Sequence, residues 1–73
     1  MQESQTINTV DLSVVIPVYN EEAVLWELYN RLNSVLKSSG VNYEVIFVND
    51  GSIDDSQKII EKINKISSNY KCL

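Results

Sequence analysis

Apolar and polar positions change their pattern several times along the chain, and each change marks a predicted element. Residues 1–10 are mostly polar and have no period, which predicts a flexible tail. Residues 12–16 read Leu-Ser-Val-Val-Ile, a short β-branched run typical of a strand buried on both faces, and Pro17 ends it. Ordered structure is therefore expected to begin near residue 11.

Two later segments carry apolar residues at helical spacing. In residues 22–39 the apolar stripe consists of Val24, Leu25, Leu28, Tyr29, Leu32, Val35 and Leu36. Trp26 lies outside this stripe and is expected to be partly exposed, and Gly40 supplies a left-handed helix end. In residues 53–67 the face consists of Ile59, Ile60, Ile63 and Ile66. These patterns predict two amphipathic helices.

Residues 43–48 form a second β-rich run between the two helices, and residues 70–73 resemble the start of a third strand. Strand, helix, strand, helix is a βαβα unit of the α/β class with parallel strands. In such sheets ligands gather beyond the carboxyl ends of the strands. The loops at residues 17–22 and 49–52 are therefore expected to lie side by side and to carry any binding site.

Composition narrows the possible functions. The chain has 73 residues, 44% of them hydrophobic, which suits one small domain with a marginal core. It has no histidine and a single cysteine, which excludes a histidine base, an internal disulfide and a zinc site built on such ligands. The net charge of −4 argues against nucleic acid as a partner. No apolar run approaches the about 20 residues that a membrane span requires.

The first loop combines a rigid turn, a ring, an amide and carboxylates. Tyr19 can stack on a planar base, and Asn20 or Glu21 can accept hydrogen bonds from ribose hydroxyls or base edges. In the alternative interpretation Tyr19 packs on the edge of the sheet, and the polar residues only start the following helix. The residues of this loop leave both interpretations open.

The second loop places Asp50 at a strand end beside a helix N-terminus. This carboxylate can accept two hydrogen bonds, which suits the N–H groups of uracil or guanine and would repel a phosphate. The alternative is an Asp-Gly turn without a ligand. Ser52 is expected to cap the helix with Asp55 in an acidic variant of the capping box, and Asp54 is expected to act only on the helix dipole.

Several other motifs are excluded. The chain has neither a Gly-x-Gly-x-x-Gly sequence nor a Walker loop, so it does not cradle phosphates in those ways. The acidic residues 50–55 do not have the spacing of a calcium loop. Cys72 is expected to be a small buried residue of a strand.

Two motifs together resemble the start of family 2 glycosyltransferases. They are Val-Val-Ile-Pro-Val-Tyr-Asn-Glu-Glu at residues 14–22 and Tyr-Glu-Val-Ile-Phe-Val-Asn-Asp-Gly-Ser-x-Asp at residues 43–54. The resemblance covers residues 12 to about 66 and is closest to the branch of dolichol-phosphate mannose synthase and bacterial polyprenyl-phosphate glycosyltransferases. It implies a Rossmann-like unit that forms the first part of a GT-A nucleotide-binding domain.

The resemblance implies roles for matching residues. Pro17 and Tyr19 would shape and stack on a base pocket, Glu21 would contact the nucleotide, and Asp50 would bind the base. Asn49 stands where the family often has another aspartate, which argues against a charged role at that position. No residue of this chain is assigned as catalytic or as a metal ligand.

The implied reaction moves a sugar from a UDP- or GDP-sugar to an acceptor, expected to be a polyprenyl phosphate at the cytoplasmic face of a membrane. A divalent cation, Mg or Mn, would be held by an Asp-x-Asp motif beyond Leu73. Residues 11–73 would thus be a truncated nucleotide-sugar-binding domain, inactive alone. Self-association is also expected, because residues 43–48 would form an unpaired sheet edge.

Two alternatives belong to other classes of protein. One is a non-catalytic nucleotide-binding module. The other is an interaction domain resembling response-regulator receivers, whose acidic strand ends hold a cation. Magnesium binding without nucleotide binding would favour the second alternative.

Overall fold

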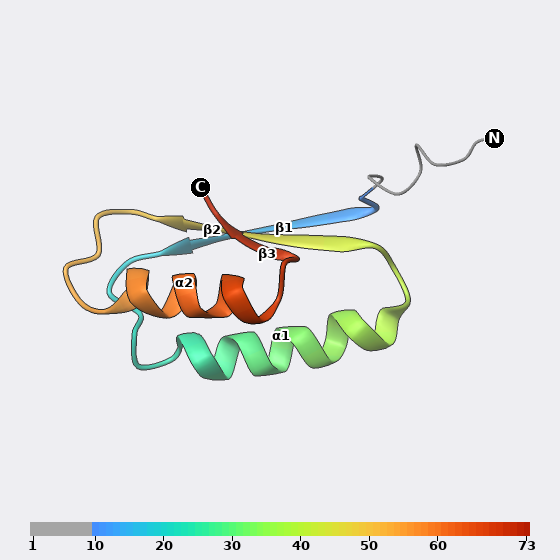
Figure 1. The fold of residues 1–73 in the computed structure, drawn as a ribbon, viewed down its shortest axis with the longest axis horizontal. Coiled ribbons are helices and arrows are strands. Elements are labelled where there is room, and N and C mark those ends of the chain that lie inside the picture. The colour runs from blue at the N-terminus through green and yellow to red at the C-terminus, as the bar shows by residue number, and fades with distance from the viewer. Residues whose placement is uncertain (1–9) are drawn as a thin grey trace.

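Five elements follow one another in the order expected for an α/β unit. They are β1 (Leu12–Val18), α1 (Leu25–Ser39), β2 (Tyr43–Asn49), α2 (Ser56–Ile66) and β3 (Tyr70–Cys72) (Figure 1). The structure is a computed structural model, and it describes residues 10–73. The tail predicted for residues 1–10 lies, apart from Val10, outside the described residues.

All three strands run parallel in one sheet of order β1-β2-β3. Leu12 pairs with Tyr43 at one end of the β1–β2 register, and Val18 pairs with Asn49 at the other. The predicted parallel βαβα unit is confirmed, and the third strand suggested for residues 70–73 forms as well. The expectation of an unpaired edge at residues 43–48 is wrong, because β3 pairs with the other side of β2 and makes it the central strand.

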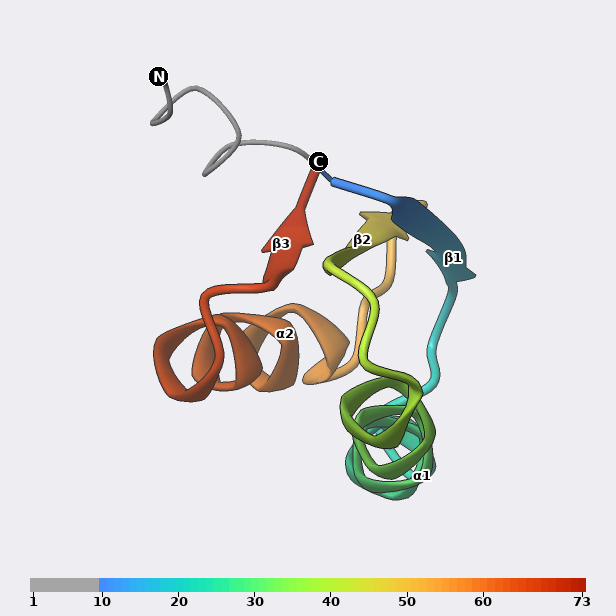
Figure 2. The ribbon, with the colours of Figure 1, turned by 90° about the vertical axis from the view of Figure 1, so that its right-hand side faces the viewer.

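Both helices lie on the same side of the sheet, as Figure 2 shows. Burial along β1 consequently alternates, with Ser13, Val15 and Pro17 exposed and with Val14, Ile16 and Val18 turned to the helices. Val15 is 60% exposed. The prediction that β1 is buried on both faces is therefore wrong, because within the described residues 10–73 only one of its faces is covered. The connections from β1 to β2 and from β2 to β3 both move in the same direction across the sheet. Because both connections also have the same handedness, their helices lie on the same face of the sheet.

A polar row crosses the open face of the sheet. Ser13 in β1 donates a hydrogen bond to Glu44 in β2 at 2.5 Å, and Lys71 in β3 lies 3.3 Å from the other carboxylate oxygen. The hydrogen bond from Ser13, followed by that from Lys71, lowers the pKa of Glu44. The row joins all three strands on the side that has no helix.

The core lies between the sheet and the two helices. Its buried apolar residues are Val18, Leu25, Tyr29, Leu36, Val45, Phe47, Ile60, Ile63 and Tyr70. Tyr70 is in contact with three other rings, among them Phe47 at a centroid distance of 6.2 Å and Tyr29 at 4.9 Å. The predicted stripes supply most of this core. The stripes were wrong at three positions that prove to be exposed: Val24, Val35 and Ile66.

The helix ends differ from expectation mainly at their starts. The first helix begins at Leu25 instead of residue 22, and the second begins at Ser56 instead of residue 53. Gly40 has φ of 75°, so the predicted left-handed end is confirmed. Trp26 is 38% exposed, also as predicted. Cys72 is exposed instead of buried, because β3 is short and forms one edge of the sheet.

Candidate functional site

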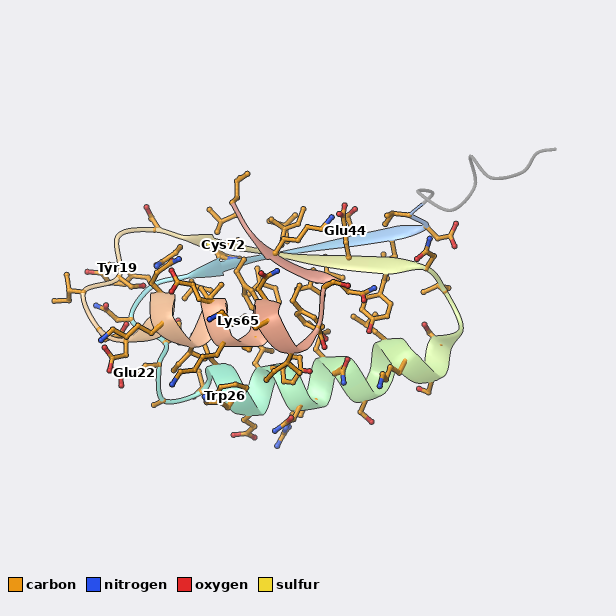
Figure 3. The ribbon with its side chains drawn as sticks, in the orientation of Figure 1. Tyr19, Glu22, Trp26, Glu44, Lys65 and Cys72 are labelled. Carbon is orange, nitrogen blue, oxygen red and sulfur yellow. The ribbon has the colours of Figure 1, made fainter. Side chains whose placement is uncertain are left out.

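The loops that follow β1 and β2 lie side by side, as predicted from parallel strands. The backbone N–H of Asp50 donates a 2.9 Å hydrogen bond to the carbonyl oxygen of Val18, which ends β1. Both loops leave the sheet at the end where Tyr19 and Glu22 are labelled in Figure 3. Residues separated by about thirty positions in the sequence thus share one edge of the fold.

Asn20 makes two hydrogen bonds between the loops. Its backbone N–H donates to Oγ of Ser52 at 2.9 Å, and its side-chain Oδ1 accepts from the backbone N–H of Ile53 at 2.9 Å. Asn20 has φ of 52°, in the left-handed region that asparagine tolerates better than most residues. This conformation presents its amide N–H and its side chain to the same neighbouring loop.

The next residues of the first loop contact the start of α2. The backbone N–H of Glu21 donates to Oγ of Ser56 at 2.9 Å, and Ser56 is fully buried. Glu22 forms a reciprocal pair, in which its N–H donates to Asp54 and its carboxylate accepts from the N–H of Asp55, both at 3.2 Å. The expected capping box of Ser52 with Asp55 is wrong, because the Asp55 side chain makes no capping hydrogen bond and Ser52 instead accepts from the first loop.

Asp54 holds a negative charge at this junction. Partial desolvation acts to raise the pKa of its carboxyl group, but hydrogen bonds from Ser56 and from the backbone N–H of Glu22 outweigh that effect and lower the pKa. Its Oδ1 accepts from the N–H of Ser56 at 2.9 Å. The carboxylate thus occupies the N-terminus of α2 where the helix dipole favours an anion.

The lowered pKa predicts an acid-sensitive junction. The interactions of Asp54 contribute stability above its ordinary pKa of 3.8, and this contribution is lost as the pH falls through the lowered value. In a titration from neutral pH into the acid range, the amide resonances of Ser56 and Glu22 are expected to shift together. In Asp54→Asn, which keeps an acceptor oxygen but does not titrate, this shared step should disappear. A step that persists in the variant would contradict the assignment.

Asn49 acts on the structure of the second loop. Its Oδ1 accepts from the N–H of Ser52 at 3.2 Å, and its side-chain amide donates to Oε1 of Gln57 at 2.8 Å. An aspartate could accept the first hydrogen bond but could not donate the second. The neutral amide at this position is therefore used to join the loop to α2.

The predicted site residues differ from their neighbours in how their side chains are used. Pro17, Tyr19, Glu21 and Asp50 are all exposed, and Tyr19 is 59% exposed. Among residues 10–73 the Tyr19 hydroxyl and the carboxylates of Glu21 and Asp50 have no hydrogen-bond partner. Five neighbouring polar side chains in the two loops make hydrogen bonds within the protein: Asn20, Glu22, Asn49, Ser52 and Asp54. The loops therefore present a ring and two carboxylates on a hydrogen-bonded framework.

The pattern along the sequence did not reveal part of this framework. Ser56 lies within the helix predicted for residues 53–67 and was given no role there, and its partner Glu21 is 35 positions away. Apart from Asn49 and its partner Gln57, the residues of the framework lie in the Asn-Glu-Glu sequence at 20–22 and the Ser-x-Asp-Asp-Ser sequence at 52–56. Only the parallel pairing of β1 with β2 shows that the two sequences bond to each other.

The carboxylates of the two loops do not form a metal site in the part of the chain that the structure describes. No group of three or more histidine, cysteine, aspartate or glutamate side chains there is placed to hold a metal ion. The oxygens of Asp54 and one oxygen of Glu22 already accept backbone N–H groups. The residues of 10–73 therefore do not fit the divalent cation that the resemblance implies.

Another hollow lies on the surface between α2 and β3. It has a volume of about 400 Å³ and is lined by Ile60, Glu61, Asn64, Lys65, Lys71 and Cys72. Lys65 and Cys72 are labelled in Figure 3. The lining has no aromatic ring, so it offers no stacking surface to a nucleobase. The two loops are the better candidate site.

Comparison with known proteins settles the family. The family model described as "Glycosyl transferase family 2" matches residues 13–73. The chain belongs to glycosyl transferase family 2. The resemblance found in the two loop motifs is thereby confirmed, and the parallel α/β arrangement is consistent with the Rossmann-like first unit of a GT-A family member.

Relatives within the family include proteins named as undecaprenyl-phosphate transferases. The chain is 44% identical, over 88% of its length, to the uncharacterized glycosyltransferase YkcC of Bacillus subtilis. It is 49% identical, over 84% of its length, to an undecaprenyl-phosphate 4-deoxy-4-formamido-L-arabinose transferase of Shewanella sediminis. A protein of that name from Proteus mirabilis is 44% identical over 96% of the chain. The chain spans about a fifth of the length of these curated relatives, which are matched over 20%, 18% and 21% respectively.

Within residues 10–73, neither helix combines the length and the hydrophobicity that crossing a lipid bilayer requires.

Proposed function

We propose that residues 11–73 form the donor-binding part of a glycosyltransferase that moves a sugar from a UDP- or GDP-sugar to a polyprenyl phosphate. The nucleotide would contact Pro17, Tyr19, Glu21 and Asp50 at the carboxyl ends of β1 and β2. Family membership supports glycosyl transfer, and the names of the relatives support an undecaprenyl-type acceptor. The parent protein would then work at the cytoplasmic face of a membrane, where such an acceptor is reached.

The observation that carries the proposal is the contrast between the side chains at the two loops. Tyr19 directly follows Val18, whose carbonyl oxygen accepts a 2.9 Å hydrogen bond from the N–H of Asp50. The side chains of Tyr19 and Asp50 are both exposed and have no hydrogen-bond partner within residues 10–73. The polar neighbours of these two residues are used within the protein. A ring and a carboxylate on adjacent backbone segments would suit a planar base that carries N–H donors.

The electrostatics favour the base over the phosphates as the group bound here. The N-terminus of α2, which elsewhere is a common phosphate site, is occupied by the Asp54 carboxylate and by Glu22. A phosphate at that point would meet negative charge. We therefore place the diphosphate beyond these loops, next to a divalent cation, Mg or Mn, held by residues other than those described. On this proposal the 73-residue chain supplies donor binding without sugar transfer.

Replacement of Asp50 by alanine tests the proposal. Loss of a charged hydrogen-bond acceptor for the base is expected to weaken binding of UDP or GDP about five- to hundred-fold, equivalent to about 1 to 3 kcal/mol. The measurement is a titration of each nucleotide against the chain, followed through backbone amide resonances. The largest shifts are expected at Tyr19 and Gly51, next to the proposed base.

Glu27→Ala is the matched control, because it removes an exposed carboxylate that pairs with Arg31 on α1, away from the loops. Its affinity for the nucleotide should equal that of the unchanged chain. Equal affinity of Asp50→Ala and the unchanged chain would refute the role of Asp50. Magnesium binding without nucleotide binding would instead support the receiver-like alternative, and nucleotide binding by a full-length protein that transfers no sugar would support the non-catalytic module.

A further inference from the structure

Two hydrogen bonds at Asn20 hold the loops together at the point where they carry the proposed nucleotide contacts. Asn20 directly follows Tyr19, and its N–H donates to Oγ of Ser52. Its Oδ1 accepts from the N–H of Ile53, so the two hydrogen bonds contact consecutive residues of the second loop. We call these two hydrogen bonds, both 2.9 Å long, the Asn20 latch.

The latch restrains the backbone conformation of the segment that carries Asp50. Only Gly51, with φ of 75°, separates Asp50 from Ser52. The backbone of Asp50 is fixed on its N-terminal side by the bond to the carbonyl of Val18. On its C-terminal side, a glycine permits many backbone conformations unless the next residue is held. Two hydrogen bonds hold Ser52: its Oγ accepts from the N–H of Asn20 at 2.9 Å, and its N–H donates to Oδ1 of Asn49 at 3.2 Å, and only the first ties Ser52 to the other loop.

We infer that Asn20 is a positioning residue that fixes the spacing between Tyr19 and Asp50 for the nucleobase, with Ser52 as its partner. The inference rests on the proposed function of these loops. The Oδ1 of Asn20 accepts the N–H of Ile53, so we assign this side chain to the contact between the loops. A preorganised pair binds more tightly because the protein loses less conformational entropy on binding.

Two variants break the latch from opposite sides without changing the charge of the protein. Asn20→Gly removes Oδ1 and tolerates the positive φ, and Ser52→Ala removes the Oγ acceptor. Each is expected to weaken UDP or GDP binding about three- to ten-fold, the effect of one lost hydrogen bond. Ser52→Thr keeps the hydroxyl and should retain the affinity of the unchanged chain. Ser13→Ala breaks a hydrogen bond on the open face of the sheet and should leave binding unchanged.

Coupling to Asp50 separates positioning from general destabilisation. In an Asp50→Ala background, Ser52→Ala should weaken binding by less than about two-fold, because the group to be positioned is already absent. Hydrogen exchange of the Ile53 amide in the unliganded chain should quicken in Asn20→Gly, which shows directly that the latch has opened. Circular dichroism identifies the temperature range in which every variant is folded.

The outcomes distinguish the two proposals. If the unchanged chain binds nucleotide and both latch variants bind equally well, the positioning role is refuted and the donor-binding function stands. If Ser52→Ala weakens binding equally with and without Asp50, the effect is general destabilisation and the positioning role is again refuted. If the unchanged chain binds neither UDP nor GDP, the proposed function fails and the positioning role fails with it.

Discussion

Replacing Phe47 by alanine is expected to lower the free energy of unfolding by about 3 to 5 kcal/mol. Phe47 is fully buried in the central strand and stacks on Tyr70 at 6.2 Å. The loss combines the transfer of a ring out of the core with the cavity that remains. Since domains of ordinary stability have only about 5 to 15 kcal/mol in total, a chain this small should be largely unfolded after the change. Urea denaturation followed by circular dichroism measures the effect.

Two matched substitutions define the scale of that measurement. Phe47→Leu keeps an apolar side chain in the core and should cost clearly less than the alanine variant. Ile53→Ala removes an apolar side chain that is 90% exposed, and should change stability by no more than about 0.5 kcal/mol. A Phe47→Ala variant as stable as Ile53→Ala would show that the packing described around β2 is not the packing in solution.

The second large effect is expected in alkali. Burial, followed by the neighbouring hydroxyls of Tyr43 and Tyr29, raises the pKa of Tyr70 from 10.0 to about 12. A tyrosine that keeps its proton in the folded state stabilises the fold fully below the ordinary pKa, and this contribution is lost as the pH rises towards the raised value. The free energy of unfolding should fall by about 1.4 kcal/mol per pH unit across that interval. Urea denaturation at a series of alkaline pH values measures this slope.

Tyr70→Phe is the control for the alkaline effect. It keeps the ring that contacts Tyr29, Tyr43 and Phe47 but removes the hydroxyl that titrates. The hydroxyl lies at a long 3.5 Å from Asn33, so little hydrogen bonding is lost with it. The part of the alkaline slope that belongs to Tyr70 should vanish in this variant. Identical slopes in the two proteins would mean that Tyr70 is accessible to water.

Periodicity predicted the fold well because local pattern and tertiary packing agree here. The β-branched runs became parallel strands, and Gly40 ended α1 where its permissive backbone allowed a left-handed residue. The failures concern neighbours that are distant in sequence. Val15 has the same apolar character as Val14, yet only Val14 faces the helices, and no local signal shows that both helices take one side.

The location of the candidate site could be predicted from the sequence, but the hydrogen bonds between its two loops could not. Parallel strands require that the ends of β1 and β2 meet, so the pairing of the two loops followed from the element order. The roles of Ser52 and Ser56 did not follow, because serine is also among the preferred local caps at the start of a helix. Their hydroxyls accept N–H groups from a loop more than thirty positions earlier in the chain. Sequence spacing within one loop carries no information about such partners.

The dependence of α2 on the first loop has a consequence for folding. The bonds from the first loop to the segment that starts this helix join residues 32 to 35 positions apart, so a long segment of chain must close before each can form. The hydrogen bond from the N–H of Ser56 to Asp54 is local, but we expect α2 to gain the contacts from the first loop once β1 and β2 have paired. We therefore expect the first turn of α2 to form late in folding, and the proposed ligand site to be assembled after the hydrophobic interior has consolidated.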